Sequence, residues 1–527
     1  ALFQHHPLGS DEFATPYETQ RIYELLAGRD VLAFFVGHGH AARAGDAGAW
    51  RWLMGGSTFG GNQGHGSCEV DGRHVRYVYD YLDPQKQRRV LLDEVQPPFA
   101  PFGLALAVEG ADASAPIDAL RLHVHVDGEG APVLRELRAF VDFADVATAS
   151  ADADAMVLTV PVAGLLPGVH VVTVEVERED GRVHHLLHEF EIAAPARESG
   201  DDARALRQIW SCRLLEAVQG PMAADGELLV VCGTAGTLSA RDLATGAPRW
   251  QCALGGPAPG GAASDGAGGF FAGTLDGVLV HVDPDGEVDW RAGVGSAIAA
   301  VPFVHGDLVL AVDLDGRGHA FQRQSGRRRW QRPLAAYAIE KPPVLLDDRR
   351  ALVGAWDTRV HAFALADGRE SWSERGKGAR AKAARYYSPA DCPPVVQDGK
   401  TFVADRSFAL MWTDLEGHEL PGDMADVASV AGDPAAHRIY LRRSTGKVTC
   451  VDSRDLRVVW DRELPVGRTP TPVTAGGGWV FAIGERDGVL YVLDADSGEV
   501  VAQHRVNAGC YPFCPVLWRD GVAVVGG

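Results

Sequence analysis

From residue 210 onwards, tryptophan recurs along this 527-residue chain at an almost constant interval, and this repeat limits the possible folds more than any other feature. The first four members are forty residues apart, the fifth follows after forty-two, and the sixth lies eighty-eight residues further on. They are Trp210, Trp250, Trp290, Trp330, Trp372 and Trp460. A period of about 20–50 residues is typical of repeat architectures, in which each unit buries its apolar face against its neighbours.

Each repeat has the pattern of short strands and tight turns, without a helical period. The segments 236–246, 277–286 and 488–498 all begin with glycine, continue as an apolar strand, and end in a turn rich in Asp and Gly. Repeats of this kind predict a β-propeller, with the tryptophans as packing between blades rather than as ligands. The repeat has eight positions. The one near Leu420 has no tryptophan, and the last repeat is cut short at Gly527. This count favours eight blades over seven, with the ring closed by the chain around Trp210.

The repeat resembles that of PQQ-type (quinoprotein-like) propellers more than the WD40 repeat, because the Gly-His and Trp-Asp marks of WD40 are absent. By this resemblance the propeller spans residues 206–527, with its last blade truncated. Binding of PQQ would require a stacking aromatic on the axis and carboxylate or amide ligands for calcium, which the sequence does not supply. The chain is therefore expected to bind an unidentified protein or ligand through a propeller without PQQ.

Residues 101–193 precede the propeller and alternate apolar and polar residues in short runs. Turns rich in Gly and Asp separate these runs, which are 120–126, 157–160, 170–176 and 188–192. Such a pattern predicts an immunoglobulin- or fibronectin-like β-sandwich. His123 and His125 share one strand face and are expected on an exposed polar surface rather than in a metal site. Residues 194–205 have the composition of a linker.

A helix is predicted near the N-terminus because both of its ends are marked. Thr15 is a suitable N-cap, Pro16 stands at the first helical position, and Glu18 completes a capping box. Gly28 suits the C-terminal stop. The apolar face of this helix is expected to consist of Ile22, Leu25 and Leu26.

Two histidine clusters follow short apolar segments on either side of this helix. His5 and His6 come after Leu2-Phe3, and His38 and His40 come after the apolar run 31–36. Ligands of α/β sheets collect beyond the carboxyl ends of parallel strands, so both clusters are expected at one sheet edge.

This order resembles the closing motifs of the calcineurin-like metallophosphoesterases, a histidine two residues before proline and then Gly-His-x-His after the next helix and strand. The resemblance implies that residues 1–100 are the C-terminal part of a partial α/β metallophosphoesterase domain. It also implies that His5, His38 and His40 ligate two metal ions (Fe, Zn or Mn), with His6 as a catalytic residue. Such a centre hydrolyses phosphate mono- or diesters by attack of a metal-bound hydroxide.

The other motifs of that family, Asp-x-His, Gly-Asp-x-x-Asp and Gly-Asn-His-Asp/Glu, have no counterpart upstream, since the chain starts at Ala1. We therefore expect phosphoesterase activity in a longer parent protein and none in this chain alone. The alternative is a vestigial metal domain on a non-catalytic propeller scaffold. A third interpretation of residues 2–10 is an expression-tag remnant.

Composition limits the remaining function classes and predicts a multidomain, mainly β protein. The net charge of −20 argues against binding to a nucleic-acid backbone, and no apolar run reaches the ~20 residues of a membrane span. The basic stretch 375–385, followed by Tyr386-Tyr387, suits either an anion site or a solvated loop. Eight cysteines without zinc or disulfide spacing suggest buried thiols. The architecture resembles secreted proteins, which predicts a periplasmic or extracellular location.

Overall fold

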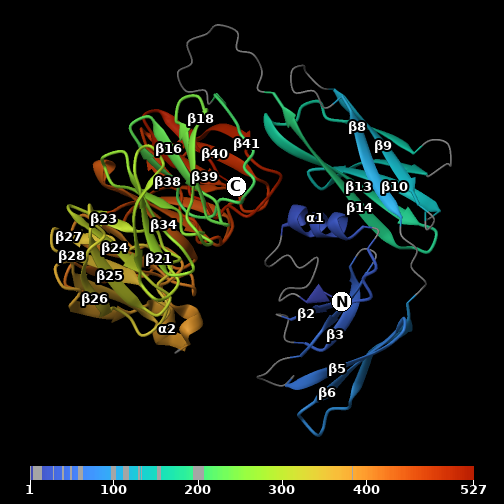
Figure 1. Cartoon of the computed structure of the whole chain (residues 1–527), viewed down its shortest axis with the longest axis horizontal. Helices are drawn as coiled ribbons and strands as arrows, with labels where there is room; N and C mark the ends of the chain where they lie inside the picture. The colour runs from blue at the N-terminus through green and yellow to red at the C-terminus, as the bar shows by residue number, and fades with distance from the viewer. Residues whose placement is uncertain are drawn as a thin grey trace. The chain divides into compact units, whose positions relative to one another are not determined.

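The computed structural model describes all residues except 1, 4–14, 28, 38–40, 48–49, 57–62, 97–101, 111–117, 129–130, 132, 151–155, 194–206, 383 and 527. The chain forms two compact units (Figure 1). The first comprises Ala1–Arg197 and Asn507–Cys510, and the second comprises Glu198–Val506 and Tyr511–Gly527. The division after Arg197 falls inside the segment that the sequence marks as a linker.

The N-terminal part of the first unit is a small sheet with one helix, α1 (Pro16–Leu26). Its strands, in spatial order, are β1 (Leu2–Phe3), β2 (Phe34–Val36), β4 (Trp50–Met54) and β3 (Arg43–Ala47). The first three run parallel, and β3 pairs antiparallel with β4. The predicted strand 31–36 is shorter than expected, because the strand begins only at Phe34.

The helix α1 starts as its sequence predicts. The Thr15 hydroxyl accepts a hydrogen bond from the Glu18 amide, and the Glu18 carboxylate accepts one from the Thr15 amide, which is a complete capping box. The buried face differs from the expectation in one position. Leu25 is 60% exposed, whereas Tyr23 is buried among the apolar side chains of β2 and β4.

The rest of the first unit consists of three antiparallel sheets. The first, β5–β7, is formed by β5 (Gly64–Asp71), β6 (His74–Tyr81) and β7 (Arg89–Val95). The second is formed by β8 (Gly103–Glu109), β9 (Ala119–Asp127) and β12 (Val157–Pro161). The third is formed by β10 (Leu134–Val141), β11 (Ala144–Ser150), β13 (Gly168–Arg178) and β14 (Val183–Ile192).

The second and third of these sheets share one apolar core, to which β9, β10, β12, β13 and β14 all contribute fully buried side chains. These residues therefore form a two-layered β-sandwich; its immunoglobulin or fibronectin type stays a prediction. On β9 the side chain of His125 is exposed and that of His123 is half-buried, as expected for a polar outer face. The helix α1 is fixed to β14, since the Glu24 carboxylate accepts a hydrogen bond from the Leu187 amide.

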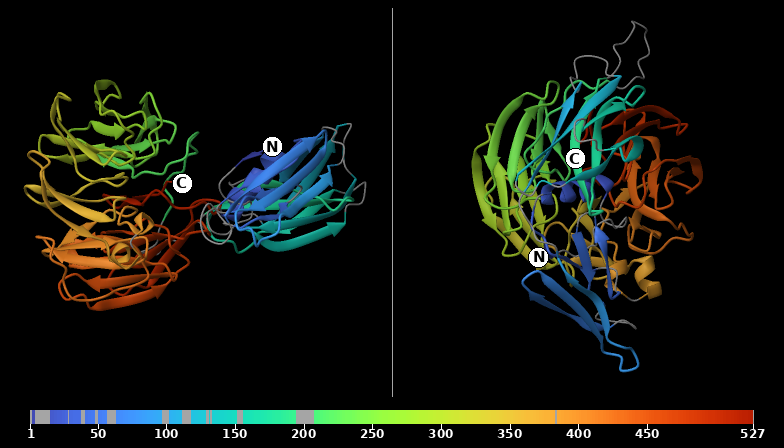
Figure 2. Two further views of the ribbon diagram at one scale, coloured as in Figure 1. Left: turned by 90° about the horizontal axis from the view of Figure 1, so that it is seen from below. Right: turned by 90° about the vertical axis from the view of Figure 1, so that its right-hand side faces the viewer.

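The second unit is a β-propeller whose blades follow one another around a ring (Figure 2). The first four blades have four antiparallel strands each. They are β15 (Ala223–Asp225), β16 (Leu228–Cys232), β17 (Thr237–Asp242) and β18 (Pro248–Ala253); β19 (Ala262–Ser264), β20 (Phe270–Gly273), β21 (Val278–Val282) and β22 (Val288–Gly293); β23 (Phe303–His305), β24 (Leu308–Val312), β25 (Arg317–Gln322) and β26 (Arg328–Pro333); and β27 (Val344–Asp347), β28 (Arg350–Gly354), β29 (Arg359–Ala364) and β30 (Glu370–Arg375).

The remaining sheets have between two and four strands, and short helices precede the first of them or lie within the second. They are β31 (Val395–Gln397), β32 (Lys400–Ala404) and β33 (Leu410–Asp414); β34 (Val427–Asp433), β35 (Arg438–Arg443), β36 (Lys447–Asp452) and β37 (Val458–Glu463); β38 (Thr474–Gly476), β39 (Trp479–Ile483), β40 (Val489–Asp494) and β41 (Val500–Arg505); and β42 (Leu517–Arg519) with β43 (Val522–Val524). The helices are α2 (Lys377–Lys382), η2 (Arg385–Tyr387) and η3 (Pro434–Ala436).

The repeating tryptophans join each blade to the next. The indole Nε1 of Trp330 donates to the Leu365 carbonyl at 2.9 Å, and its ring lies against Gly368, a turn glycine with φ of +72°. A Cβ at Gly368 would lie 2.7 Å from the ring, so this turn requires glycine both for its φ and for the close approach. The same pair of contacts recurs at Trp210, Trp250, Trp290, Trp372 and Trp460.

The ring closes through the short sheet β42–β43 and the segment around Trp210. The indole of Trp210 contacts the first blade, through the Leu243 carbonyl and Gly246, as each later tryptophan contacts its next blade. Residues of this segment, of β43 and of β16 share one core. Trp210 thus helps to close the ring as predicted, although Trp210 does not lie in a strand.

The predicted repeat position near Leu420, which has no tryptophan, corresponds to the fifth blade. This blade has three strands among the described residues, and single bridges at Glu419 and Met424 take the place of a fourth. The indole of Trp412, on the third strand, donates to the Pro421 carbonyl within the same blade. This blade therefore lacks the tryptophan contact to the sixth blade.

Candidate functional site

On one face of the propeller the chain passes from the last strand of each blade to the first strand of the next. We call this face the loop face. On this face the turn between the second and third strands of a blade contacts the connection to the next blade: the Leu254 amide donates to the Gly236 carbonyl, and the Ala258 amide donates to the Thr234 carbonyl. The Gly376 amide donates to the Thr358 carbonyl in the same way. The loop face consists of residues 211–222, 233–236, 254–261, 274–277, 294–302, 313–316, 334–343, 355–358, 376–382, 384–394, 405–409, 425–426, 444–446, 464–473, 484–488 and 511–516.

Exposed large apolar side chains of the propeller gather on the loop face. Five of them lie there, in four different connections and one turn: Leu215, Leu275, Tyr337, Tyr386 and Phe513. Among the described residues of the second unit, three others are exposed elsewhere: Ile209, Leu345 and Val458. Large exposed apolar side chains on one rim are typical of a surface that contacts another protein.

Two arginines stack on aromatic rings between the third, fourth and fifth blades. The guanidinium carbon of Arg385 lies 4.0 Å from the centre of the Tyr337 ring. That of Arg406 lies 4.5 Å from the centre of the Tyr386 ring and 5.5 Å from that of Trp356. We call these five residues the arginine–aromatic patch. Stacked guanidinium groups keep their in-plane donors available, which suits recognition of carboxylates.

Two basic residues in the middle of the stretch 375–385 are already neutralised within the chain. Lys377 is 2.9 Å from the Asp423 carboxylate, and Arg380 pairs with Glu374 and with Glu419. Their charges hold α2 against the fifth blade and are not available to a ligand. Neither Arg375 nor Arg385 has a carboxylate within ion-pair distance in the described part of the chain, so the anion-site interpretation narrows to these two residues.

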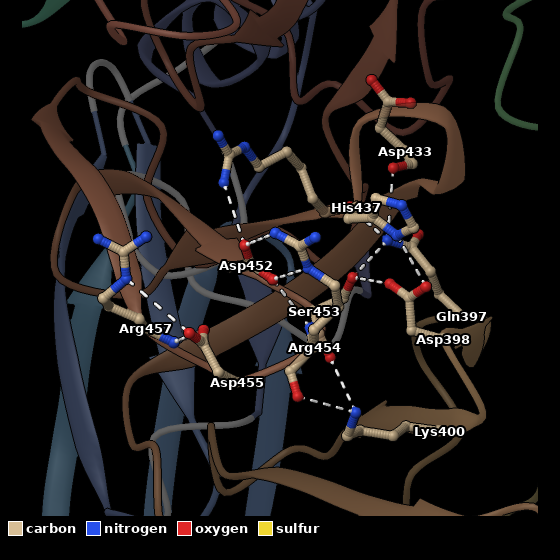
Figure 3. Close-up of polar contacts among 11 residues, drawn as sticks. Gln397, Asp398, Lys400, Asp433, His437, Asp452, Ser453, Arg454, Asp455 and Arg457 are labelled. Carbon is tan, nitrogen blue, oxygen red and sulfur yellow. Dashed lines mark hydrogen bonds and ion pairs between the residues drawn. The ribbon is translucent and has the colours of Figure 1, made fainter.

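The opposite face carries a polar network between the fifth and sixth blades (Figure 3). Its centre is Asp398, whose carboxylate accepts hydrogen bonds from the Ser453 hydroxyl and from His437 Nδ1, the latter at 2.8 Å. Gln397 Nε2 donates to Ser453 Oγ at 2.8 Å, and Lys400 Nζ donates to the Ser453 carbonyl at 3.2 Å. Asp398 and His437 both have positive φ, +49° and +53°.

This network contains the residue types of a catalytic triad in an order that cannot activate the serine. In a triad the histidine stands between serine and carboxylate and accepts the serine proton. Here the carboxylate of Asp398 stands between them, and Ser453 is fully buried. The hydrogen bond from Ser453 lowers the pKa of Asp398, and the hydrogen bond from Arg454 lowers that of Asp452, so both carboxyls stay ionised at neutral pH. We interpret the network as a clamp between blades.

The predicted metal ligands His5, His38 and His40, and the predicted catalytic His6, lie outside the described residues. The strands that precede them are described. β1 and β2 pair in parallel, with Leu2 opposite Phe34 and Phe3 opposite Phe35. The carboxyl ends of these two strands therefore lie at the same edge of the sheet. Within the described part of the chain, no three His, Cys, Asp or Glu side chains are grouped as a metal site would require.

A protein-family model described as outer membrane protein assembly factor BamB matches this chain over residues 235–462 and, in a second overlapping match, over residues 341–520. The two matches together span 235–520, more than half of the chain. The chain belongs to the BamB family. This confirms the quinoprotein-like repeat and the propeller of the sequence prediction. The matched residues lie outside residues 1–100, so this match does not support the metallophosphoesterase resemblance.

Individual BamB proteins are also similar to this chain. The chain is 30% identical over 360 residues to outer membrane protein assembly factor BamB of Burkholderia pseudomallei, covering 61% of this chain and 85% of that protein. It is 24% identical over 250 residues to BamB of Yersinia pestis, covering 46% of this chain and 62% of that protein, less than two thirds of its length. Among solved structures, the computationally designed Ika8 protein shares the fold, with a TM-score of 0.50, 16% identity, and coverage of 59% and 95%.

Sequence reasoning missed most of the arginine–aromatic patch. Tyr337, Trp356 and Arg406 come from three separate segments and follow no local motif. The only signal in the sequence was Tyr386 directly after the basic stretch 375–385. The partner residues become visible only when neighbouring blades are assembled.

In the described residues, no helix is long and apolar enough to span a membrane.

Proposed function

We propose that this protein is a non-catalytic propeller scaffold that binds protein partners through its loop face during outer-membrane protein assembly, in the periplasm. The observation that carries the proposal is the gathering of exposed apolar side chains, including Leu215, Leu275 and Phe513, on the loop face of a BamB-family propeller. The BamB relatives are named as outer membrane protein assembly factors. The polar network around Asp398 supports a structural rather than a catalytic role for the opposite face.

Loss of the exposed apolar groups should weaken partner binding. We expect the double variant Leu275→Ser/Phe513→Ser to retain its thermal stability and to co-precipitate about tenfold less of the outer-membrane assembly proteins, since ~1.4 kcal/mol of lost contact is a factor of ten in affinity. The measurement is quantitative mass spectrometry after affinity isolation from the organism that encodes the chain. The matched control is Ile209→Ser/Val458→Ser, which removes exposed apolar groups outside the loop face. Equal recovery with both double variants would contradict the proposal.

A second candidate function concerns residues 1–100, as the closing part of a metal-dependent phosphoesterase domain. The observation that favours it is the parallel pairing of β1 with β2, whose carboxyl ends precede His5 and His38 by two residues each. The metal ions would be held by His5, His38 and His40, with His6 near the substrate. This candidate is independent of the loop face.

A measurement of metal binding distinguishes the two interpretations of this domain, part of a phosphoesterase or a vestigial domain. We expect the isolated chain to bind Zn²⁺ or Mn²⁺ weakly, to lose this binding in His38→Ala/His40→Ala, and to hydrolyse p-nitrophenyl phosphate negligibly, because the visible ligands make up only part of a two-metal centre. Isothermal titration calorimetry measures the binding, and His123→Ala is the control. Unchanged binding in the double variant would remove this candidate. Rapid hydrolysis by the unaltered chain would show that the centre is complete.

A further inference from the structure

The arginine–aromatic patch offers one guanidinium that the chain itself does not neutralise. Arg385 is exposed and lies over Tyr337, and no carboxylate of the described residues is within ion-pair distance of it. Arg406, the other stacked arginine, is 3.1 Å from the Asp391 carboxylate and is already paired. A ligand with a negative charge would therefore gain most from Arg385.

The surroundings of Arg385 make this charge unusual in the molecule. The chain carries a net charge of −20, and the nearby Lys377 and Arg380 are paired with carboxylates. Among the described residues Arg375 also has no carboxylate partner, but no aromatic ring is stacked on it. A tyrosine face orients the guanidinium and leaves its in-plane N–H groups free for a bidentate contact. An unpaired, oriented arginine on an acidic protein is a specific feature rather than part of a diffuse positive surface.

The aromatic rings beside Arg385 define the shape of the ligand. Tyr337 is 46% exposed and Tyr386 is 57% exposed, and they come from the connections on either side of the fourth blade. They offer two apolar surfaces next to one positive charge. A chain segment with an apolar or aromatic side chain next to a carboxylate satisfies both, whereas a bare phosphate or a nucleic-acid backbone satisfies only the charge.

We propose that the arginine–aromatic patch binds an acidic, aromatic-containing peptide segment of the protein partner, with a carboxylate of that segment on Arg385 and an apolar side chain between Tyr337 and Tyr386. This rests on the proposed function and gives it a partner chemistry. We choose an acidic segment because a carboxylate complements the charge of Arg385. We expect an apolar side chain beside it because the two tyrosines are exposed.

A fluorescent ten-residue peptide with alternating aspartate and phenylalanine tests the proposal by fluorescence anisotropy with the full chain. Binding should weaken about tenfold in Arg385→Gln and severalfold in Tyr386→Ser, in line with loss of a charged and an aromatic anchor. Arg375→Gln is the matched control, because Arg375 is also exposed and without a carboxylate partner but has no stacked ring. A peptide with lysine in place of aspartate should bind at least tenfold more weakly than the acidic one.

Two outcomes would overturn the proposal: equal loss in Arg385→Gln and Arg375→Gln, or displacement of the peptide by heparin or by phosphatidylglycerol vesicles at the same charge concentration, which would show that any polyanion suffices. Thermal melting of each variant establishes that the fold is intact. If the peptide does not bind but Leu275→Ser/Phe513→Ser still releases the assembly proteins, only the partner chemistry is wrong and the loop-face function stands.

Discussion

Replacement of Trp460 by alanine is expected to lower the free energy of unfolding of the propeller by about 3–5 kcal/mol. The side chain is 9% exposed, belongs to the core between the sixth and seventh blades, and donates a hydrogen bond to the Ala495 carbonyl at 2.9 Å. Alanine leaves a cavity and an unpaired carbonyl together. Guanidinium denaturation followed by circular dichroism measures the loss, and Val458→Ala, on the same strand and 49% exposed, should change stability by less than about 1 kcal/mol.

Substitution of the glycine that contacts the Trp460 ring tests the same contact between blades without removing the indole. A Cβ at Gly498 would lie 2.5 Å from the Trp460 ring at a φ of +68°, whereas a Cβ at Gly478, with a φ of +81° in the same blade, meets nothing within 4 Å. Both alanine variants carry the cost of a positive φ, and only Gly498→Ala also disturbs the indole. Equal losses for the two variants would show that the tryptophan contact does not hold neighbouring blades together.

Acidification is expected to destabilise the first unit selectively, because two histidines are buried in it in their neutral form. His184 and His185 on β14 are 4% and 6% exposed, and their rings contact Trp50, Phe102 and Tyr23. Neither ring nitrogen of His184 has a hydrogen-bond partner among the residues that the structure describes. Burial lowers the pKa of each histidine from 6.5 to about 4. For His184, the nearby charges of Arg178 and Arg182 act in the same direction and that of Asp180 opposes them.

The sign follows from proton uptake. Between pH 6.5 and about 4 the unfolded chain binds protons that the folded chain does not, so the free energy of unfolding falls as the pH falls through this window. At 1.36 kcal/mol per pKa unit the loss across the whole window is roughly 3 kcal/mol for each histidine. Calorimetry at several pH values should show the transition of the first unit moving to lower temperature more steeply than that of the propeller.

A variant comparison isolates the histidines from other acid-sensitive groups. We expect His184→Leu/His185→Leu to flatten the pH dependence of the first transition between pH 6.5 and 4.5. His65→Gln, at an exposed position on β5, should leave the dependence unchanged. The account would be contradicted if the double variant kept the full acid sensitivity of the unaltered chain.

The propeller could be predicted because its signals are local and repeated. A tryptophan every forty residues and a Gly-rich turn before it define both sides of the same contact, so the periodicity alone indicated that neighbouring blades meet there. The capping box of α1 was predictable for the same reason, since Thr15 and Glu18 are three residues apart. The predicted Leu25 was wrong because tertiary packing, through Tyr23 against Trp50, decided which face of α1 is buried.

The loop face could not be predicted residue by residue. Leu275 and Phe513 are separated by more than two hundred residues and share a surface only after the ring has closed. The sequence instead predicted a functional site at the His5 and His38 clusters, since these follow a recognisable motif order. Membership in the BamB family instead points to the propeller, because the residues that the family model matches lie within it.

The most direct test of the loop face is site-specific photo-crosslinking in the organism that encodes the chain. A benzophenone side chain at Tyr337 or Phe513 is predicted to form discrete adducts with outer-membrane assembly proteins, identified by mass spectrometry. The same probe at Asp285 or Asp455, in exposed turns of the opposite face, is predicted to form none. Adducts with those proteins from the opposite face, and not from Tyr337 or Phe513, would contradict the account.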